Sequence, residues 1–252
     1  MKEAQPISPE ILNSAIRRTL LIEAQNQPKL PNDIDAVWVF AGPGNYFIPL
    51  KKGEQPWQIF MDRDRIHTSL RLYRALAAKR IANRSDQQIP PSTLSLEELT
   101  RLGPYFIYNG NPEENGAFQE AFAKGLLKLP YEKVIILDEV ESPNGNHPIA
   151  TTVDQIASFY QELARVDSPL RRCHRVALVS HSPHFVRIPH YIRQFEEEFL
   201  RQHGRLVNYF VFGVKSNQVV FNQFVREELE KLTAYISCGH LNPVPTPHLT
   251  IV

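Results

Sequence analysis

Cysteine is scarce in this chain of 252 residues, which contains only Cys173 and Cys238 and has no CxxC pair. Two isolated thiols argue against a disulfide framework and exclude a thiol-rich zinc site. No apolar run approaches the about 20 residues that a membrane-spanning helix needs. The N-terminal segment lacks the apolar core of a signal peptide, because Arg17 and Arg18 interrupt it. We therefore expect a cytoplasmic protein without membrane insertion.

A large net charge is also missing. The chain has 28 basic and 27 acidic residues, which gives a net charge of +1. This balance provides no global attraction to nucleic acid, so we expect no nucleic-acid partner, and any anion recognition must be local. Neither the GxGxxG dinucleotide motif nor the GK[ST] of a P-loop occurs. The sequence sets no oligomeric state.

Short apolar runs alternate with amphipathic stretches along the chain. The runs lie at residues 35–41, 105–108, 133–138, 175–180 and 207–214. Helices are predicted after Ser8 and over residues 116–128 and 218–238, among others, while the proline-rich tail resists a helix and is expected along the surface. We predict a single α/β domain over residues 1–252. Its fold would be a Rossmann-like three-layer sandwich with a mainly parallel sheet of about five strands.

Ligands of open parallel sheets bind beyond the carboxyl ends of the strands, where the connections diverge. This rule brings together four loops, at residues 42–45, 109–111, 139–146 and 180–187. The first loop would offer backbone donors and the second would orient polar groups, although each could be a plain turn. The candidate ligand-binding residues of these two loops are Gly42, Gly44, Asn45, Asn109, Gly110 and Asn111.

The third loop, "EVESPNGNHP", supplies carboxylates, a hydroxyl and amides. Glu139 and Glu141 could act as acid, base or hydroxyl acceptor, because a carboxylate near a sheet edge has a tunable pKa. Ser142 and Asn144 are candidate ligand-binding residues. The alternative is a turn of ordinary composition.

The fourth loop, "SHSPHFVR", follows the fourth apolar run. Its histidines lack the HExxH spacing, so no metal site is predicted. Instead, Ser182 and the proline after it would begin a helix whose free amides favour an anion. His184 would then act as acid or donor, and Arg187 would hold charge. Ser180 and His181 complete the candidate ligand-binding residues of this loop.

Arg65 lies near the start of a predicted helix, where its positive charge opposes the helix dipole and suggests that it faces the same site. Local pairing with nearby aspartates is the alternative. For Arg187, the ligand-binding hypothesis makes a sharp prediction. Replacing it by alanine should weaken ligand binding much more than it lowers thermal stability.

The order of these elements resembles the DUF218, or YdcF-like, family, which includes SanA- and ElyC-type envelope proteins. The likeness spans roughly residues 35–215. It rests on the glycine loop, "DRIHTSLRLYRAL", "YFIYNGN" with Glu120 in the helix after it, "ESPN" with "TVDQ", and "SHSPHFVR". The last segment matches the family's Thr-Ser-x-Tyr-His-x-x-Arg run and places His184 and Arg187 on its histidine and arginine. The family's acid–Ser–Asn–Thr run places Thr152 among the ligand-binding residues.

The resemblance implies a Rossmann-like fold and binding of S-adenosylmethionine or a nucleotide, with a link to envelope polysaccharide pathways. It implies no settled reaction. A rival resemblance, to phosphoribohydrolases related to lysine-decarboxylase-like proteins, needs a PGGxGTxxE segment that this sequence lacks.

Three hypotheses follow. In the first, the crevice binds a small anionic or phosphorylated ligand, and any reaction is a group transfer or hydrolysis. In the second, the protein is a non-catalytic regulator or adaptor that binds a ligand or partner with the same fold. In the third and weakest, it is a metal-dependent hydrolase.

Overall fold

Six parallel strands form the central sheet of the computed structural model, which describes residues 7–25, 29–41, 63–85, 88–215 and 218–252. Their order is β3-β2-β1-β6-β7-β8. Along the chain they are β1 (Ala36–Phe40), β2 (Tyr105–Asn109), β3 (Val134–Leu137), β6 (Arg175–His181), β7 (Asn208–Val214) and β8 (Leu249–Ile251). A two-stranded antiparallel hairpin, β4 (Glu139–Val140) with β5 (His147–Pro148), lies outside this sheet.

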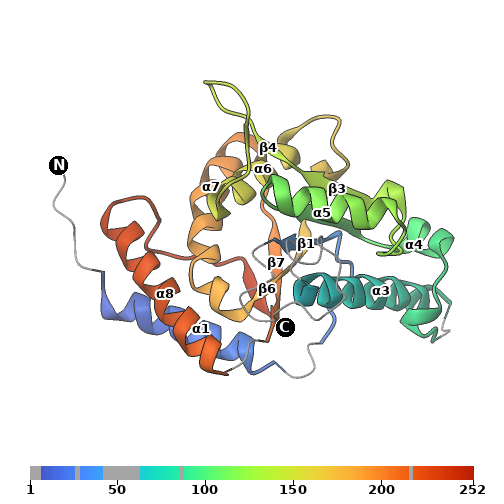
Figure 1. Ribbon diagram of the computed structural model, residues 1–252, viewed down its shortest axis with the longest axis horizontal. Helices are drawn as coiled ribbons and strands as arrows, with labels where there is room; N and C mark the ends of the chain where they lie inside the picture. Colours follow the sequence, from blue (N-terminus) through green and yellow to red (C-terminus); the bar gives the residue numbers. More distant parts are fainter. Residues whose placement is uncertain (1–6, 26–28, 42–62, 86–87, 216–217) are drawn as a thin grey trace.

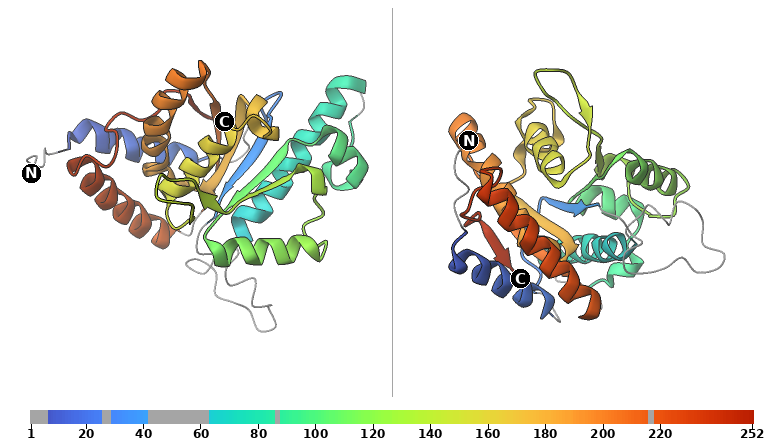
Figure 2. Two further views of the ribbon diagram at one scale, coloured as in Figure 1. Left: turned by 90° about the horizontal axis from the view of Figure 1, so that it is seen from above. Right: turned by 60° about the vertical axis from the view of Figure 1, so that its left-hand side comes forward.

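Helices cover both faces of the sheet, as Figures 1 and 2 show. The helices are α1 (Pro9–Glu23), α3 (Arg63–Ser85), α4 (Leu96–Leu102), α5 (Pro112–Ala123), α6 (Thr152–Ala164), α7 (Ile188–His203) and α8 (Gln218–Ser237). Single turns of 3-10 helix are η2 (Pro91–Thr93), η3 (Tyr131–Lys133), η4 (Pro169–Arg172) and η5 (Ser182–Val186). The predicted Rossmann-like three-layer sandwich is therefore confirmed.

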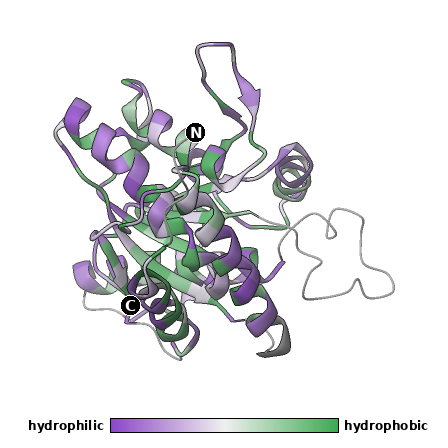
Figure 3. Cartoon of the chain, turned by 90° about the vertical axis from the view of Figure 1, so that its left-hand side faces the viewer, coloured by the Kyte–Doolittle hydropathy of each residue, from purple (hydrophilic) through white to green (hydrophobic). Residues whose placement is uncertain are grey.

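The alternation of side chains along β1 produces two separate hydrophobic cores. Trp38 and Phe40 belong to the core that includes residues of α1, α6 and α7, whereas Val37 and Val39 belong to the core on the side of α3, α4 and α5. All five residues of β1 are buried. This is the pattern of a parallel strand covered on both faces, and Figure 3 shows hydrophobic residues along the strands inside a more hydrophilic shell.

Local signals set several helix starts. Ser95 and Glu98 form the predicted capping box of α4, and Thr151 with Asp154 forms another at α6. The helix predicted over residues 116–128 instead spans Pro112–Ala123, because Asn111 caps it and a proline occupies its first turn. The sequence between residues 182 and 187 forms the short turn η5, and the long helix α7 restarts at Ile188.

The proline-rich tail differs from the prediction. It contributes β8, a sixth strand of three residues that pairs with β7. Among the residues that the structure describes, no helix is long and apolar enough to cross a bilayer.

The order of the sheet places a topological switch point between β1 and β6. The chain runs from β1 outward to β2 and β3, then returns beside β1 at β6 and continues to β7 and β8. In sheets of this kind the connections leave in opposite directions from the switch point and open a crevice there. The crevice is therefore expected beyond Phe40 and His181.

Candidate functional site

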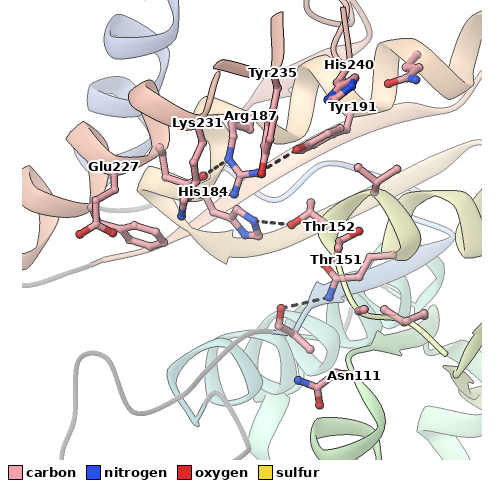
Figure 4. A pocket seen from close by; sticks show the side chains of 18 of the residues that line it. Asn111, Thr151, Thr152, His184, Arg187, Tyr191, Glu227, Lys231, Tyr235 and His240 are labelled. Carbon is pink, nitrogen blue, oxygen red and sulfur yellow. Dashed lines mark hydrogen bonds and ion pairs between the residues drawn. The ribbon is translucent and has the colours of Figure 1, made fainter. Parts of the chain in front are cut away.

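A cavity of about 1000 Å³ lies at this switch point. Its walls come from Ala41 after β1, from the start of α6, from η5 and α7, and from the last helix, α8. Figure 4 shows the side chains of these elements facing a common space. Five of the predicted site residues line the cavity: Arg65, Asn111, Thr152, His184 and Arg187.

The His184 ring lies between two hydroxyl groups. Its Nε2 atom is 3.1 Å from the Thr152 Oγ1 atom, and its Nδ1 atom is 3.0 Å from the Ser180 Oγ atom. Burial, followed by the positive charges of Arg65 and Arg187, holds the pKa of His184 well below its usual value of 6.5. The imidazole is therefore neutral at physiological pH.

Arg187 is held by a buried carboxylate from α8. Its Nε and Nη2 atoms donate to the two carboxylate oxygens of Glu228 at 2.6 and 3.0 Å, and its Nη1 atom donates to the Tyr191 hydroxyl at 3.0 Å. The rings of Tyr191 and Tyr235 lie 5.6 and 5.8 Å from the guanidinium carbon. Lys231 contacts the same carboxylate at 3.1 Å. Burial alone would lower the pKa of Arg187, but Glu228 and Tyr191 together raise it.

The charge of Arg187 is thus already committed within the protein. A bidentate arginine–carboxylate pair of this kind fixes α8 to the start of α7. The hydrogen bonds to Glu228 and Tyr191 use three of the five guanidinium N–H donors, so two have no hydrogen-bond partner among the described residues, and Arg187 lines the cavity. Arg187 can therefore contact a ligand, but it also has a structural role that the sequence alone did not indicate.

Arg65 enters the cavity wall from α3. It lies in the first turn of α3, is 3% exposed, and donates from Nη1 to the carbonyl oxygen of Phe40 at 2.7 Å. This bond draws the guanidinium toward the end of β1, beside the switch point. The predicted placement of Arg65 at the site is therefore matched by its position in the cavity wall.

Asn109 does not line the cavity, although it ends β2 at the expected edge. Its Oδ1 atom accepts from the Trp38 indole at 2.9 Å, and its Nδ2 atom donates to the backbone of Gln155 at 2.7 Å. The Gln155 side chain donates back to the Asn109 carbonyl at 2.7 Å. Asn109 is fully buried, so these bonds make it a structural link between β1, β2 and α6.

Gly110 is required by close packing. A Cβ atom at this position would lie 2.6 Å from the carboxylate of Glu114 and 2.7 Å from the Cβ of Ala41. Asn111 caps α5 by accepting from the Glu114 amide at 2.9 Å, and both side chains lie in the cavity wall. The second loop therefore contributes one polar side chain, Asn111, rather than three residues.

The structure does not bring the third loop to the cavity. Glu139 and Glu141 are exposed on the β4–β5 hairpin, which projects from the sheet edge in Figure 1. Ser142 donates to the Gly145 carbonyl at 2.7 Å, and Asn144 is exposed in the same turn. The turn interpretation thus describes this segment, because its antiparallel pairing carries the carboxylates away from the strand end.

The remaining candidates lie beside the cavity or outside the described residues. Ser180, His181 and Ser182 are buried and do not line it. The Ser180 hydroxyl lies 3.0 Å from the Nδ1 atom of His184, and the Ser182 hydroxyl lies 3.4 Å from the carbonyl of Val214. The predicted backbone donors Gly42, Gly44 and Asn45 lie outside the residues that the structure describes.

Sequence reasoning missed the wall that α8 contributes. Glu228, Lys231 and Tyr235 come from this helix, and His240 follows it. The apolar stripe of α8 predicts a buried face, but nothing local marks Glu228 as buried. In the sequence, Glu228 is a carboxylate next to the apolar positions of the helix, and its partner, Arg187, lies 41 residues earlier in the chain.

Ionisable groups of both signs surround the cavity. Arg65, Arg187 and Lys231 face Glu114, Glu227 and Glu228, and three aromatic side chains, Tyr191, Tyr235 and His240, lie together at the α7–α8 end. In the described part of the chain, no group of three or more His, Cys, Asp or Glu residues could hold a metal ion.

Comparison of the chain with protein-family models, with curated proteins and with solved structures finds no match. The geometry of the cavity is therefore the basis for a functional proposal.

Proposed function

We propose that the protein binds a small ligand with an anionic group in this cavity, with the negative group beside His184. The ligand classes proposed are a phosphorylated metabolite, a nucleotide or S-adenosylmethionine. One observation carries the proposal: a buried neutral imidazole lies in a cavity wall where the positive charges of Arg65 and Arg187 disfavour its protonation. An anion at this position would offset those charges.

Protonation of His184 and binding of an anion near its ring affect each other. The charges of Arg65, Arg187 and, more weakly, Lys231 lower the pKa of His184, so an anion near the ring must raise it. By linkage, protonation of His184 must then strengthen anion binding. The pair of Arg187 with Glu228 offsets part of the positive charge of that arginine.

The far end of the cavity favours a ligand with a planar ring. Tyr191 and Tyr235 have ring centroids 6.5 Å apart, and His240 lies 6.5 Å from Tyr235. Such rings can stack on a nucleobase. A nucleotide would use both ends of a cavity whose volume is at the upper end of the usual range for small-molecule sites. The sulfonium of S-adenosylmethionine would instead find its countercharge at Glu227.

The resemblance to the YdcF-like family supports the same position, because the two residues of its best-matching segment, His184 and Arg187, both line the cavity. If a reaction occurs there, we propose group transfer or hydrolysis, with His184 as acid or donor. A non-catalytic ligand-binding regulator is the alternative. Binding of adenosine monophosphate without any turnover of it would favour that alternative.

Sulfate is a suitable test ligand because its charge stays constant from neutral to mildly acidic pH. We expect saturating sulfate to raise the pKa of His184, measured by NMR from the ring chemical shifts. Sulfate affinity should increase as the pH falls. Arg65→Gln should weaken sulfate binding about tenfold or more, the value of one charge-assisted hydrogen bond.

Glu139→Gln is the matched control, because it removes a charge from the exposed hairpin and should leave sulfate binding unchanged. An unchanged pKa of His184 in saturating sulfate would overturn the proposed function. So would equal sulfate affinity in Arg65→Gln and in the unmodified protein.

A further inference from the structure

Ser180 is a fully buried hydroxyl on β6 that has a single hydrogen-bond partner among the described residues. That partner is the Nδ1 atom of His184, at 3.0 Å. Buried hydroxyl hydrogens are rarely left without an acceptor. Since no other acceptor is in reach within the described parts of the chain, Ser180 must donate its hydrogen to Nδ1.

This donation selects the tautomer of the neutral ring. With Nδ1 as acceptor, the hydrogen of His184 is on Nε2, and Nε2 donates to the Thr152 Oγ1 atom at 3.1 Å. The Thr152 hydroxyl thus accepts from the ring and keeps its own hydrogen. Thr152 is half-buried and lines the cavity, as Figure 4 shows. In the described structure that hydrogen has no acceptor, so it faces the cavity.

We propose that Ser180 is a positioning residue that fixes the Nε2–H tautomer of His184 and so makes the Thr152 hydroxyl a donor for an unprotonated oxyanion of the ligand. The inference rests on the proposed function, since it assumes that the cavity takes an anion. It assigns a role to a residue outside the cavity wall. It also makes His184 a donor rather than a base in the resting protein.

The Nδ1–H tautomer of His184 would reverse the role of the Thr152 hydroxyl, from donor to acceptor toward the cavity. With the hydrogen on Nδ1, the Nε2 lone pair would accept from Thr152, and the threonine would turn oxygen lone pairs toward the cavity. It would also leave the buried Ser180 hydrogen unsatisfied. The cost of one unsatisfied buried donor favours the Nε2–H tautomer by about 10- to 100-fold. The same chain of bonds therefore either attracts or repels an oxyanion, according to the position of one proton.

The first experiment measures the tautomer without any ligand. The ¹⁵N and ¹³C chemical shifts of His184 in the unmodified protein should show the Nε2–H form. Finding the Nδ1–H form would overturn the proposal, whatever the protein binds. This measurement requires no variant, so it remains decisive if a substitution at the buried Ser180 prevents folding.

The second experiment measures sulfate affinity. Ser180→Ala removes the preference for Nε2–H, so the Nδ1–H form of His184 should become detectable by NMR and sulfate binding should weaken by up to about twofold, although Ser180 does not touch the cavity. Ser180→Thr, which keeps the hydroxyl, should retain both properties. Thr152→Val removes the donor itself and should weaken sulfate binding by about tenfold or more, and Thr152→Ser should restore it.

Thr233→Val is the control, because its hydroxyl bonds to the Leu229 carbonyl on α8 and does not line the cavity. If His184 has the same tautomer populations in Ser180→Ala as in the unmodified protein, the positioning role of Ser180 is wrong while the proposed function stands. If the Nε2–H form is present but the unmodified protein does not bind sulfate, the proposed function fails, and the ligand role of Thr152 fails with it.

Discussion

Replacement of Arg187 by methionine should destabilise the protein strongly, because it leaves the carboxylate of Glu228 buried without its main partner. The two side chains are 10% and 1% exposed, and the pair is bidentate. Removing one member of a buried ion pair typically costs about 3–5 kcal/mol. Lys231 remains 3.1 Å from the carboxylate and is 45% exposed, so it offsets part of this loss. We therefore expect the lower end of that range, about 3 kcal/mol.

A double-mutant cycle tests this magnitude. Arg187→Met, Glu228→Gln and the double variant should be compared by urea unfolding, and the double variant should regain much of the stability that Arg187→Met loses. In a thermal scan, about 3 kcal/mol corresponds to a decrease of roughly 6–12 °C in Tm for a chain of this size. Arg226→Met is the control, because its ion pair with Glu230 lies on the same helix with side chains 82% and 64% exposed.

The structural role of the Arg187–Glu228 pair is refuted if Arg187→Met lowers the free energy of unfolding by less than about 1 kcal/mol and its effect adds to that of Glu228→Gln. That result would also restore the simpler expectation from sequence, in which Arg187 serves only the ligand. The structure instead predicts that substitution of Arg187 affects stability and binding together.

Three further predictions concern other residues. His190 is fully buried, and burial lowers its pKa from 6.5 to about 4. Between these pH values the unfolded protein binds more protons at this residue than the folded protein does. The free energy of unfolding should therefore fall by up to about 3 kcal/mol as the pH drops from 6.5 to 4. His190→Gln should flatten this pH dependence, measured by urea unfolding at several pH values. Asn109→Ala should lower the free energy of unfolding by about 2–4 kcal/mol because it removes partners from the buried network of the Trp38 indole, and a decrease below about 1 kcal/mol in urea unfolding would contradict the assignment. The double variant Glu139→Gln, Glu141→Gln should change Tm by less than about 2 °C and leave sulfate affinity unchanged, since both carboxylates are exposed. A loss of sulfate binding would instead show that the β4–β5 hairpin contributes to the site.

The strands of the sheet were predictable because their burial on both faces produces continuous apolar runs. The runs at 35–41 and 175–180 correspond closely to β1 and β6, whose ends define the switch point. The rule for ligand sites in parallel sheets then predicts a crevice at this edge, where Arg65, Thr152 and His184 now lie in one cavity wall.

The features that the sequence did not predict, strand β8 and the buried bonds of Asn109 and Glu228, depend on contacts between residues far apart in the chain. β8 has only three residues in a proline-rich tail, and its conformation depends on pairing with β7 rather than on local propensity. The sequence did not indicate the inward bonds of Asn109, because a polar residue at a strand end can satisfy its bonds inward, and Trp38 and Gln155 supply partners that sequence spacing does not show. Glu228 was missed for the same reason.

The two sides of the cavity come from opposite ends of the polypeptide, near Ala41 and near His240. Closing so long a chain segment is slow relative to forming local structure. A ribosome-bound or partly folded chain could therefore assemble β1, β2 and β3 with their covering helices and still hold no ligand. The cavity wall would be complete only when the last helix docks with Lys231 and Tyr235, which would make binding of the proposed ligand a report on completion of the fold.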